Sequence, residues 1–310
     1  MALRRKAMFF TLISVLLVTI IIISFTFYSS YRTQSKMFVV ETRVNTMDRF
    51  IEDLEKDMER ALYIAGFRAI LGAEDYIIKN GEYLDNPSSL LGELAINGTL
   101  NGTQLNLTID SSLSDWFDRV SIQGQNIGVE MNYTMLGFEI NQSDPWFIDF
   151  YVDLELDISD TKGIAKWNRN KTAFGTVSIV GLEDPVYTIG AYGRTTRIIN
   201  KTEDNIQGID DLKDFLDSGA YRANSDAPSF LMRLEGNLSS SPYGIETLVN
   251  TNEFAFYELN VYDRSSIDYI YFGTHSTTGY KIYNITDVYM EGFRLDQDHI
   301  DEFDVNDFKY

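Results

Sequence analysis

The residues that most often carry out chemistry in proteins are absent or isolated in this sequence. There is no cysteine, which excludes thiol catalysis, thiolate metal sites and disulfides. The two histidines, His275 and His299, have no partner at a spacing typical of a metal site, so we expect no histidine-based zinc or iron centre. Ser159 and Lys162 match a Ser-x-x-Lys pattern, but its companion motifs are missing and Gly163 indicates a turn. The sequence also has no nucleophile elbow, P-loop or dinucleotide-binding motif.

Carboxylates are the abundant reactive groups, with 46 Asp and Glu against 26 Lys and Arg. Two carboxylates can hydrolyse a glycosidic bond, but in so acidic a chain some pairs meet in any fold, and composition alone does not indicate a hydrolase. The C-terminal segment lacks the sixth-position glycine of an EF-hand loop, and we interpret it as a solvated end, not a Ca²⁺ site. Its acidic residues are Asp296, Asp298, Asp301, Glu302, Asp304 and Asp307. We therefore expect no enzyme, no cofactor and no metal site.

The charges divide sharply along the chain. Residues 1–36 contain five basic and no acidic groups, which leaves 21 basic against 46 acidic groups in residues 37–310, a net charge near −25. Such a surface repels phosphate backbones, so we expect no nucleic-acid partner. Secreted eukaryotic domains of this size usually contain disulfides, so the lack of cysteine favours a prokaryotic surface.

The element that must position the rest of the chain is an apolar N-terminal stretch. Ala7–Tyr28 contains 22 residues without a charge, Gly or Pro, about 33 Å as a helix and long enough to cross a bilayer. The basic leader, residues 1–6, favours a cytoplasmic N-terminus and an extracellular remainder. A cleavable signal peptide is the alternative, but its apolar region is shorter, and Tyr28–Tyr31 is a poor match to a cleavage site. We favour a retained single-pass anchor.

Residues 29–80 are predicted to continue the same helix in amphipathic form. Apolar or small residues recur at alternating intervals of four and three from Val40 to Ala65, with charged residues between them, and Asn80-Gly81 is a helix stop. This stripe can pair with a partner helix or lie on the protein's own domain. We favour the second interpretation, because Phe50, Leu62 and Phe67 widen the stripe beyond a coiled-coil seam.

The first 80 residues or so resemble the N-terminus of type IV pilins, particularly archaeal pilin-like proteins. The resemblance rests on a short basic leader, an apolar helix that begins at Met8 and its amphipathic continuation. It implies that a dedicated peptidase cuts between the leader and the apolar helix, where Lys6, Ala7 and Met8 form the junction. The sequence departs from the bacterial pattern, because no acidic residue occurs between Met8 and Val40 and the glutamate that pairs with a neighbouring subunit is missing.

Nine Asn-X-Ser/Thr sequons are a second indication of the compartment. Chance predicts about three from this composition, and all nine lie beyond residue 96, in the part expected outside. Many sequons without cysteine are typical of an archaeal envelope protein. The predicted glycosylation sites are Asn97, Asn101, Asn106, Asn132, Asn141, Asn170, Asn200, Asn237 and Asn284.

Residues 81–310 are predicted to form an α+β extracellular domain, with a subdivision near residue 200 left open. Helical periodicity and caps predict short helices at 88–93, 111–123, 210–216 and 296–303. Alternating or short apolar runs predict strands at 127–140, 147–156, 174–180, 186–189, 230–234, 254–261, 267–272 and 281–288. The fold class is thus a long transmembrane and amphipathic helix packed on an antiparallel, β-rich extracellular domain.

These observations predict a glycosylated, membrane-anchored cell-surface protein of pilin-like architecture, which acts in surface assembly or adhesion without catalysis. Its expected partners are the lipid bilayer and, through Val40–Ala65, further copies or pilin-like helices. The alternative is an anchored module that binds an extracellular solute or polymer, for which we expect a deep aromatic-lined pocket. A third hypothesis is an anchored hydrolase, which requires carboxylates that converge in a cleft.

Overall fold

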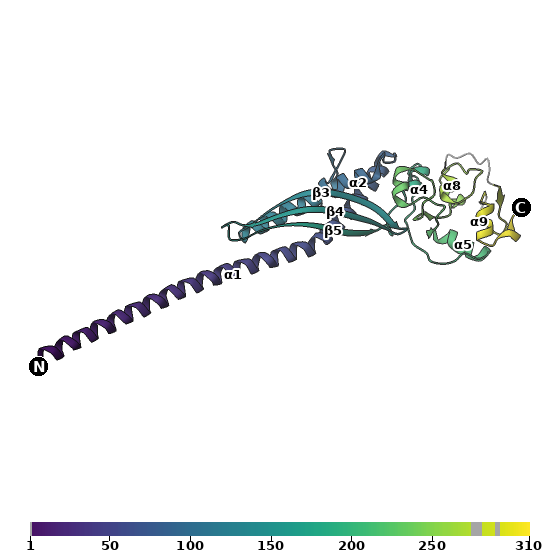
Figure 1. Ribbon diagram of the computed structural model, residues 1–310. Coiled ribbons are helices and arrows are strands. Elements are labelled where there is room, and N and C mark those ends of the chain that lie inside the picture. Colours follow the sequence, from purple (N-terminus) through teal and green to yellow (C-terminus); the bar gives the residue numbers. More distant parts are fainter. Residues whose placement is uncertain (1, 274–280, 289–291) are drawn as a thin grey trace. The chain divides into compact units, whose positions relative to one another are not determined.

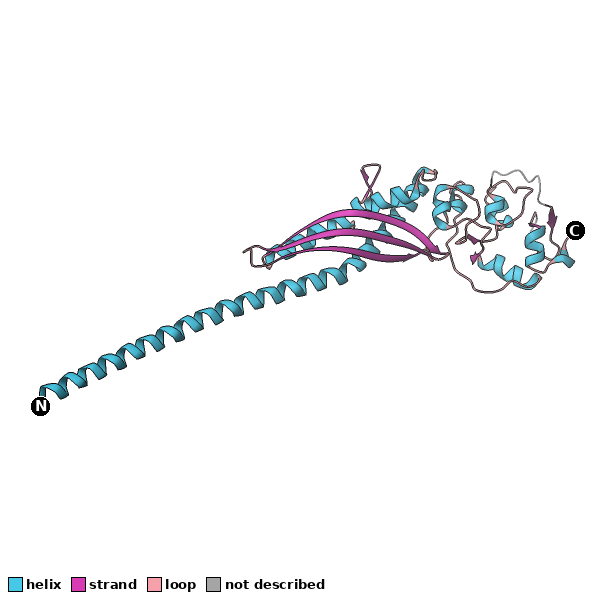
Figure 2. Cartoon of the chain, in the orientation of Figure 1, coloured by secondary structure: helices cyan, strands magenta, loops and turns pink. Residues whose placement is uncertain are grey.

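The N-terminal quarter of the chain is a single helix. The computed structural model describes residues 2–273, 281–288 and 292–310, and α1 runs from Ala2 to Asn80 (Figures 1 and 2). No Gly or Pro occurs before Gly66, and hydroxyls in the apolar part donate to carbonyls four residues earlier, as Ser14 does to Phe10. The helix ends at Gly81, which has a φ of +69° and donates to the Ile77 carbonyl. The predicted helix and its stop are confirmed.

The described chain comprises two compact units. The first contains residues 1–55, 121–132 and 156–169, and the second contains the remaining segments. In the first unit, the Arg43 guanidinium donates to the Asp160 carboxylate and to the carbonyls of Ile127 and Gly128. Asp160 also accepts from the Lys162 backbone N–H at 2.9 Å. These contacts hold residues 127–128 and the turn that follows Asp160 against the part of α1 around Arg43.

The second unit contains most of a three-stranded sheet formed by β3 (Val129–Asp144), β4 (Phe147–Asp160) and β5 (Lys166–Ser178). The strand order is β3-β4-β5, and short turns join the strands, which makes neighbours antiparallel. One face of β4 and one face of α1 are buried in this unit, at Phe150, Val152, Leu154, Met58, Leu62, Ala65 and Ala69.

Two glycines in this unit allow α1 to approach the sheet closely. A Cβ at Gly66 would lie 2.8 Å from the Phe150 ring, and a Cβ at Gly175 would lie 2.9 Å from the Tyr63 backbone nitrogen. Within the second unit, the apolar stripe is therefore a seam on the protein's own sheet. In the first unit, the stripe residues Met47, Ile51 and Leu54 are buried as well. Val40, at the start of the stripe, is exposed.

Short elements of the second unit precede the sheet. They are α2 (Pro87–Asn97), the hairpin β1 (Thr99–Leu100) and β2 (Thr103–Gln104), the 3-10 helix η1 (Asn106–Thr108), and α3 (Leu113–Asn126), which extends into the first unit. Asn86 caps α2 by accepting from the Ser89 N–H, and Ser112 and Asp115 cap the start of α3 reciprocally. Both helices were predicted, and each extends a few residues beyond its predicted end.

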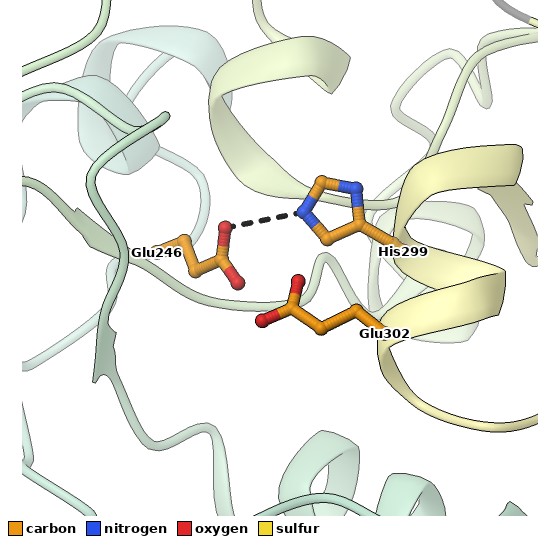
Figure 3. Close-up of side chains that lie close together, drawn as sticks. All are labelled: Glu246, His299 and Glu302. Carbon is orange, nitrogen blue, oxygen red and sulfur yellow. Dashed lines mark hydrogen bonds and ion pairs between the residues drawn. The ribbon is translucent and has the colours of Figure 1, made fainter.

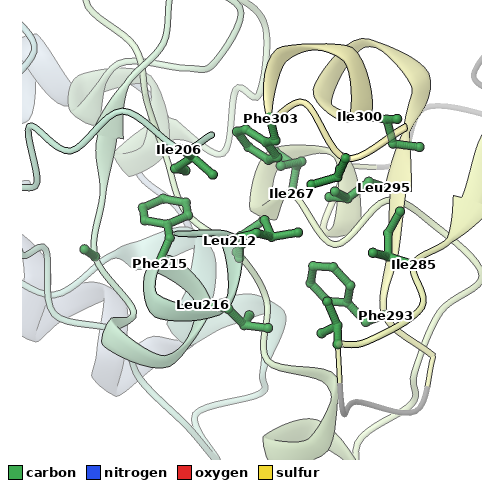
Figure 4. Packing of buried hydrophobic residues seen from close by; sticks show 14 residues of the cluster. Ile206, Leu212, Phe215, Leu216, Ile267, Ile285, Phe293, Leu295, Ile300 and Phe303 are labelled. Carbon is green, nitrogen blue, oxygen red and sulfur yellow. The ribbon is translucent and has the colours of Figure 1, made fainter. Parts of the chain in front are cut away.

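The rest of the second unit consists of short helices and two-stranded sheets. The helices are α4 (Pro185–Gly190), α5 (Ile209–Ser218), α6 (Phe230–Glu235), α7 (Thr251–Phe256), α8 (Asp268–Tyr271), α9 (Gln297–Glu302) and the 3-10 helix η2 (Asn306–Phe308). The strands β6 (Arg222–Ala223) and β7 (Ile245–Glu246) form one pair, and β8 (Ile282–Asn284) and β9 (Arg294–Asp296) form another. Figure 4 shows the apolar core that joins α5, β9 and α9, with Leu212, Phe215, Leu295 and Ile300.

Four predicted strands are wrong. The segments 186–189, 230–234, 254–261 and 267–272 contain α4, α6, part of α7 and α8. Apolar runs this short do not separate a helical from an extended period, and local caps decide the outcome. Asp184 and Asn250 accept the N–H groups of Val186 and Glu253 at two of these helix starts. Residues 281–288 are strand only at 282–284. The predicted helices at 210–216 and 296–303 are confirmed as α5 and α9, and the class is α+β.

Candidate functional site

The predicted glycosylation sites lie mostly on the surface. Eight of the nine sequon asparagines are exposed, namely Asn97, Asn101, Asn106, Asn132, Asn141, Asn170, Asn200 and Asn237. Asn284, in β8, is half-buried, and its side-chain oxygen accepts from Arg294 Nε at 2.8 Å. The structure thus leaves eight of these side chains accessible to a modifying enzyme.

The predicted leader junction lies at the start of α1. Lys6, Ala7 and Met8 fall within the first two turns of the helix, directly before its apolar stretch. By length and composition α1 can cross a membrane, and none of the 18 residues in its most apolar window is buried within the chain. The exposed side chains beyond Tyr28 include Tyr31, Met37, Phe38, Val39 and Val40.

A cluster of ionisable side chains joins β7 to α9. Glu246 comes from β7, while His299 and Glu302 are three residues apart on α9 and therefore share one face of the helix. Figure 3 shows the three side chains directed toward one another. His299 Nε2 lies 3.3 Å from Glu246 Oε2, and one donor atom from each of the three residues lies within 4.8 Å of the others. These residue types and distances are those from which metal sites are built.

Further side chains hold this cluster in place. His299 Nδ1 lies 2.8 Å from the carboxylate of Asp296, the N-cap of α9, which in turn accepts from Ser265 Oγ at 2.6 Å. Glu246 accepts from Asn224 Nδ2 at 2.7 Å and from Arg222 Nε at 2.6 Å. Arg222 also lies 2.7 Å from Glu302.

These contacts determine the charges in the cluster. Burial acts to lower the pKa of His299, but hydrogen bonds to Asp296 and Glu246 outweigh it and raise the pKa to about 10. Burial acts to raise the pKa of Glu246, and the hydrogen bond from His299 together with the charges of His299 and Arg222 lowers it overall. In the absence of other ligands, the cluster at neutral pH therefore contains an imidazolium and an arginine beside three carboxylates.

A second buried network surrounds Arg233 on α6. Its Nη1 lies 2.7 Å from Asp184 and 2.6 Å from Asp268, and all three side chains are fully buried. The Tyr221 hydroxyl donates to Asp184 at 2.8 Å. Because Arg233 bridges the two carboxylates and solvent does not reach them, this pair has no open position for a substrate.

Glu74 of α1 is a further carboxylate near that network, and the charges that act on it are those of Glu183 and Asp184. It is buried, and its Oε1 has no hydrogen-bond partner among the residues that the structure describes. Burial and the charges of Glu183 and Asp184 raise the pKa of Glu74 to about 8, so it is largely protonated at neutral pH.

A hollow in the second unit has a volume of about 380 Å³ and is lined mainly by acidic and polar residues: Thr202, Asp204, Asn205, Ile206, Asp211, Asp214, Phe215 and Ser218. With one aromatic ring, it differs from the aromatic-lined pocket expected of a solute-binding module.

The sequence did not reveal the cluster on β7 and α9. The His299-x-x-Glu302 spacing was visible as two donors on one helical face, but Glu246 is 53 residues earlier, on a two-residue strand that no pattern indicates. His275 lies outside the described residues. Comparison with protein-family models, curated proteins and solved structures gave no match to this chain.

Proposed function

We propose that this chain is a single-pass, glycosylated cell-surface protein of pilin-like architecture, which assembles with further copies through the exposed part of α1. The observation that carries the proposal is the apolar surface of α1, which the rest of the chain leaves uncovered from Phe9 to Val40. An exposed apolar surface of this length requires lipid or other helices to cover it.

The first part of this surface fits a bilayer. The uncharged stretch Ala7–Tyr28 has the length of the hydrocarbon core, and its Ser14, Thr19 and Thr26 hydroxyls are bonded to the helix backbone. The basic residues on its N-terminal side favour a cytoplasmic N-terminus, and the acidic remainder then lies outside.

The second part of this surface supports assembly over simple anchoring. Met37, Phe38, Val39 and Val40 are consecutive and between 44% and 71% exposed. Successive residues are about 100° apart on a helix, so these four surround its whole circumference. They begin about 14 Å beyond the end of the span, out of reach of the lipid core for an upright helix. One partner helix covers one side, so full burial of this ring requires neighbours on several sides.

Disulfide cross-linking in native membranes tests assembly directly. The unmodified chain has no cysteine, so every cross-link must form at an introduced cysteine. The double variant Met37→Cys/Val39→Cys places two thiols about 200° apart on α1. On mild oxidation we expect a ladder of covalent multimers. The matched control, Asp48→Cys together with Asn45→Cys, uses exposed polar positions on the same helix and should give far less product. If the double variant remains monomeric on oxidation, as the control is expected to do, assembly through α1 is contradicted.

A further inference from the structure

The cluster of Glu246, His299 and Glu302 contains more carboxylates than permanent positive charges. Arg222 pairs with Glu246 and Glu302, and Asp296 contacts His299 Nδ1, so the three carboxylates share one permanent positive charge. Two negative charges remain when the imidazole is neutral. A proton on His299 offsets one of them, whereas a divalent cation offsets both.

We propose that a divalent first-row transition metal, with Zn²⁺ as the probe, binds between His299 Nε2 and the carboxylates of Glu246 and Glu302. One imidazole and two carboxylates are a ligand set that suits zinc and its neighbours, while Ca²⁺ and Mg²⁺ prefer oxygen ligands alone. The site is independent of α1 and of the proposed assembly.

The ligand atoms are close to a coordinating arrangement. Zn–N and Zn–O bonds of about 2.0–2.2 Å place tetrahedral ligand atoms roughly 3.3–3.6 Å apart. His299 Nε2 and Glu246 Oε2 are 3.3 Å apart, and the complete set lies within 4.8 Å. A change of rotamer at Glu302 can bring its carboxylate oxygen to the tetrahedral separation, because its side chain is 47% exposed.

The surrounding contacts resemble the outer shell of a metal site. The carboxylate of Asp296 holds His299 Nδ1–H and thereby directs Nε2 toward Glu246, the arrangement common among metal-binding histidines. Ser265 fixes Asp296, and Asn224 fixes Glu246. Arg222 contacts Oε1 of each glutamate, so the proposed metal ligands are Oε2 of Glu302 and Oε2 of Glu246, which also accepts from Asn224 Nδ2.

Metal binding has a structural consequence. The cation would link β7 to α9, two elements that are about fifty residues apart in the sequence. The Glu302 side chain is 47% exposed, so a cation from solvent can reach this ligand.

The test uses the full-length chain in detergent, stripped with EDTA and then dialysed against Zn²⁺. We expect one zinc per chain by elemental analysis and a rise in the unfolding temperature. Glu302→Gln should weaken zinc binding at least tenfold, because an amide is a poor substitute for a carboxylate ligand. Asp298→Asn is the matched control, since Asp298 is exposed on the same helix and belongs to no part of the cluster. It should bind zinc like the unmodified chain.

Co²⁺ provides a readout that does not depend on stability. Its visible spectrum should show a low-coordinate site with a nitrogen ligand, and the signal should disappear in Glu302→Gln while the metal-free variant unfolds at the unmodified temperature. Substoichiometric zinc, or equal zinc affinity for Glu302→Gln and Asp298→Asn, would overturn the proposal.

Discussion

Arg233 is the clearest case of a single residue on which a large part of the second unit depends. Its guanidinium is fully buried and joins Asp184, at the start of α4, to Asp268, at the start of α8. Coulombic attraction to these carboxylates outweighs burial and raises its pKa. A buried charge of this kind contributes little net stability as a pair, but removal of one partner leaves the others buried and uncompensated.

Arg233→Leu should therefore destabilise the protein by about 3–5 kcal/mol, because Asp184 and Asp268 lose the charge that they share. Urea unfolding of the full-length chain measures this free energy. Lys79→Ala is the control, since Lys79 forms an ion pair with Asp75 one turn earlier on the surface of α1. Removal of this surface ion pair should cost less than about 0.5 kcal/mol. Equal losses for the two variants would show that Arg233 does not hold the network.

Glu74 predicts a dependence of stability on pH. Its pKa is 4.5 for the model compound and about 8 in the folded chain, so the folded state retains a proton that the unfolded state releases. This difference lowers stability progressively as pH rises from 4.5 to 8. Glu74→Gln removes the titration and should increase stability by about 4–5 kcal/mol at pH 8.5, with little change at pH 4.

Urea unfolding of both chains at the two pH values checks this prediction. The titration of His299 is common to both chains and cancels in the comparison. A constant difference between Glu74→Gln and the unmodified chain at both pH values would contradict the assignment.

At the level of elements, the contact between α1 and the sheet depends on small residues. Gly175 of β5 lies against the backbone of α1, where a Cβ would be 2.9 Å from the Tyr63 nitrogen and 3.2 Å from the Leu62 carbonyl carbon. Because both are backbone atoms, neither can move without shifting the helix. The close approach lets the apolar face of α1 cover β4 directly.

Gly175→Ala should therefore cost about 1–3 kcal/mol, as expected for overpacking a dense interface. Gly92→Ala is the matched control on α2, where a Cβ would meet only Phe138 at an ordinary 3.6 Å. That variant should be neutral or stabilising by up to about 1 kcal/mol, since alanine favours a helix interior. Thermal unfolding distinguishes the two variants, and a neutral Gly175→Ala would rule out the close contact.

The long elements were predictable from sequence and the short ones were not. The uninterrupted α1 and the alternating runs of β3 and β4 are long enough for their periods to be unambiguous. Phe230–Leu234 is too short for that, although Gly236 after it is a typical helix end that could have indicated α6.

The side-chain clusters depend on tertiary contacts between distant segments. Asp184, Arg233 and Asp268 are separated by 35 to 49 residues, and their pairing follows from where α4, α6 and α8 pack. The same holds for Glu246 with His299. A single sequence carries no pattern that links such positions.

At the scale of the whole molecule, the proposed function combines a membrane anchor with a glycosylated extracellular part. The exposed sequon asparagines predict that protein isolated from its native membrane carries glycans on several of them. Intact mass spectrometry should give a mass above that of the polypeptide, and it also reports the first residue, which is Met8 if the leader is removed. Asn101→Gln should lose one glycan, whereas Asn205→Gln, at an asparagine outside any sequon, should lose none. A native mass equal to that of the bare polypeptide would exclude glycosylation.

The most direct test of the account is the side of the membrane on which the acidic part of the chain lies. Ser240→Cys introduces a single exposed thiol there, and Leu16→Cys places one inside the apolar stretch. With a membrane-impermeant maleimide on intact cells, we predict labelling at residue 240 and none at residue 16, with both chains in the membrane fraction. Labelling at residue 240 only after lysis, or recovery of the chain in the soluble fraction, would contradict a membrane-anchored chain whose acidic part lies outside the cell.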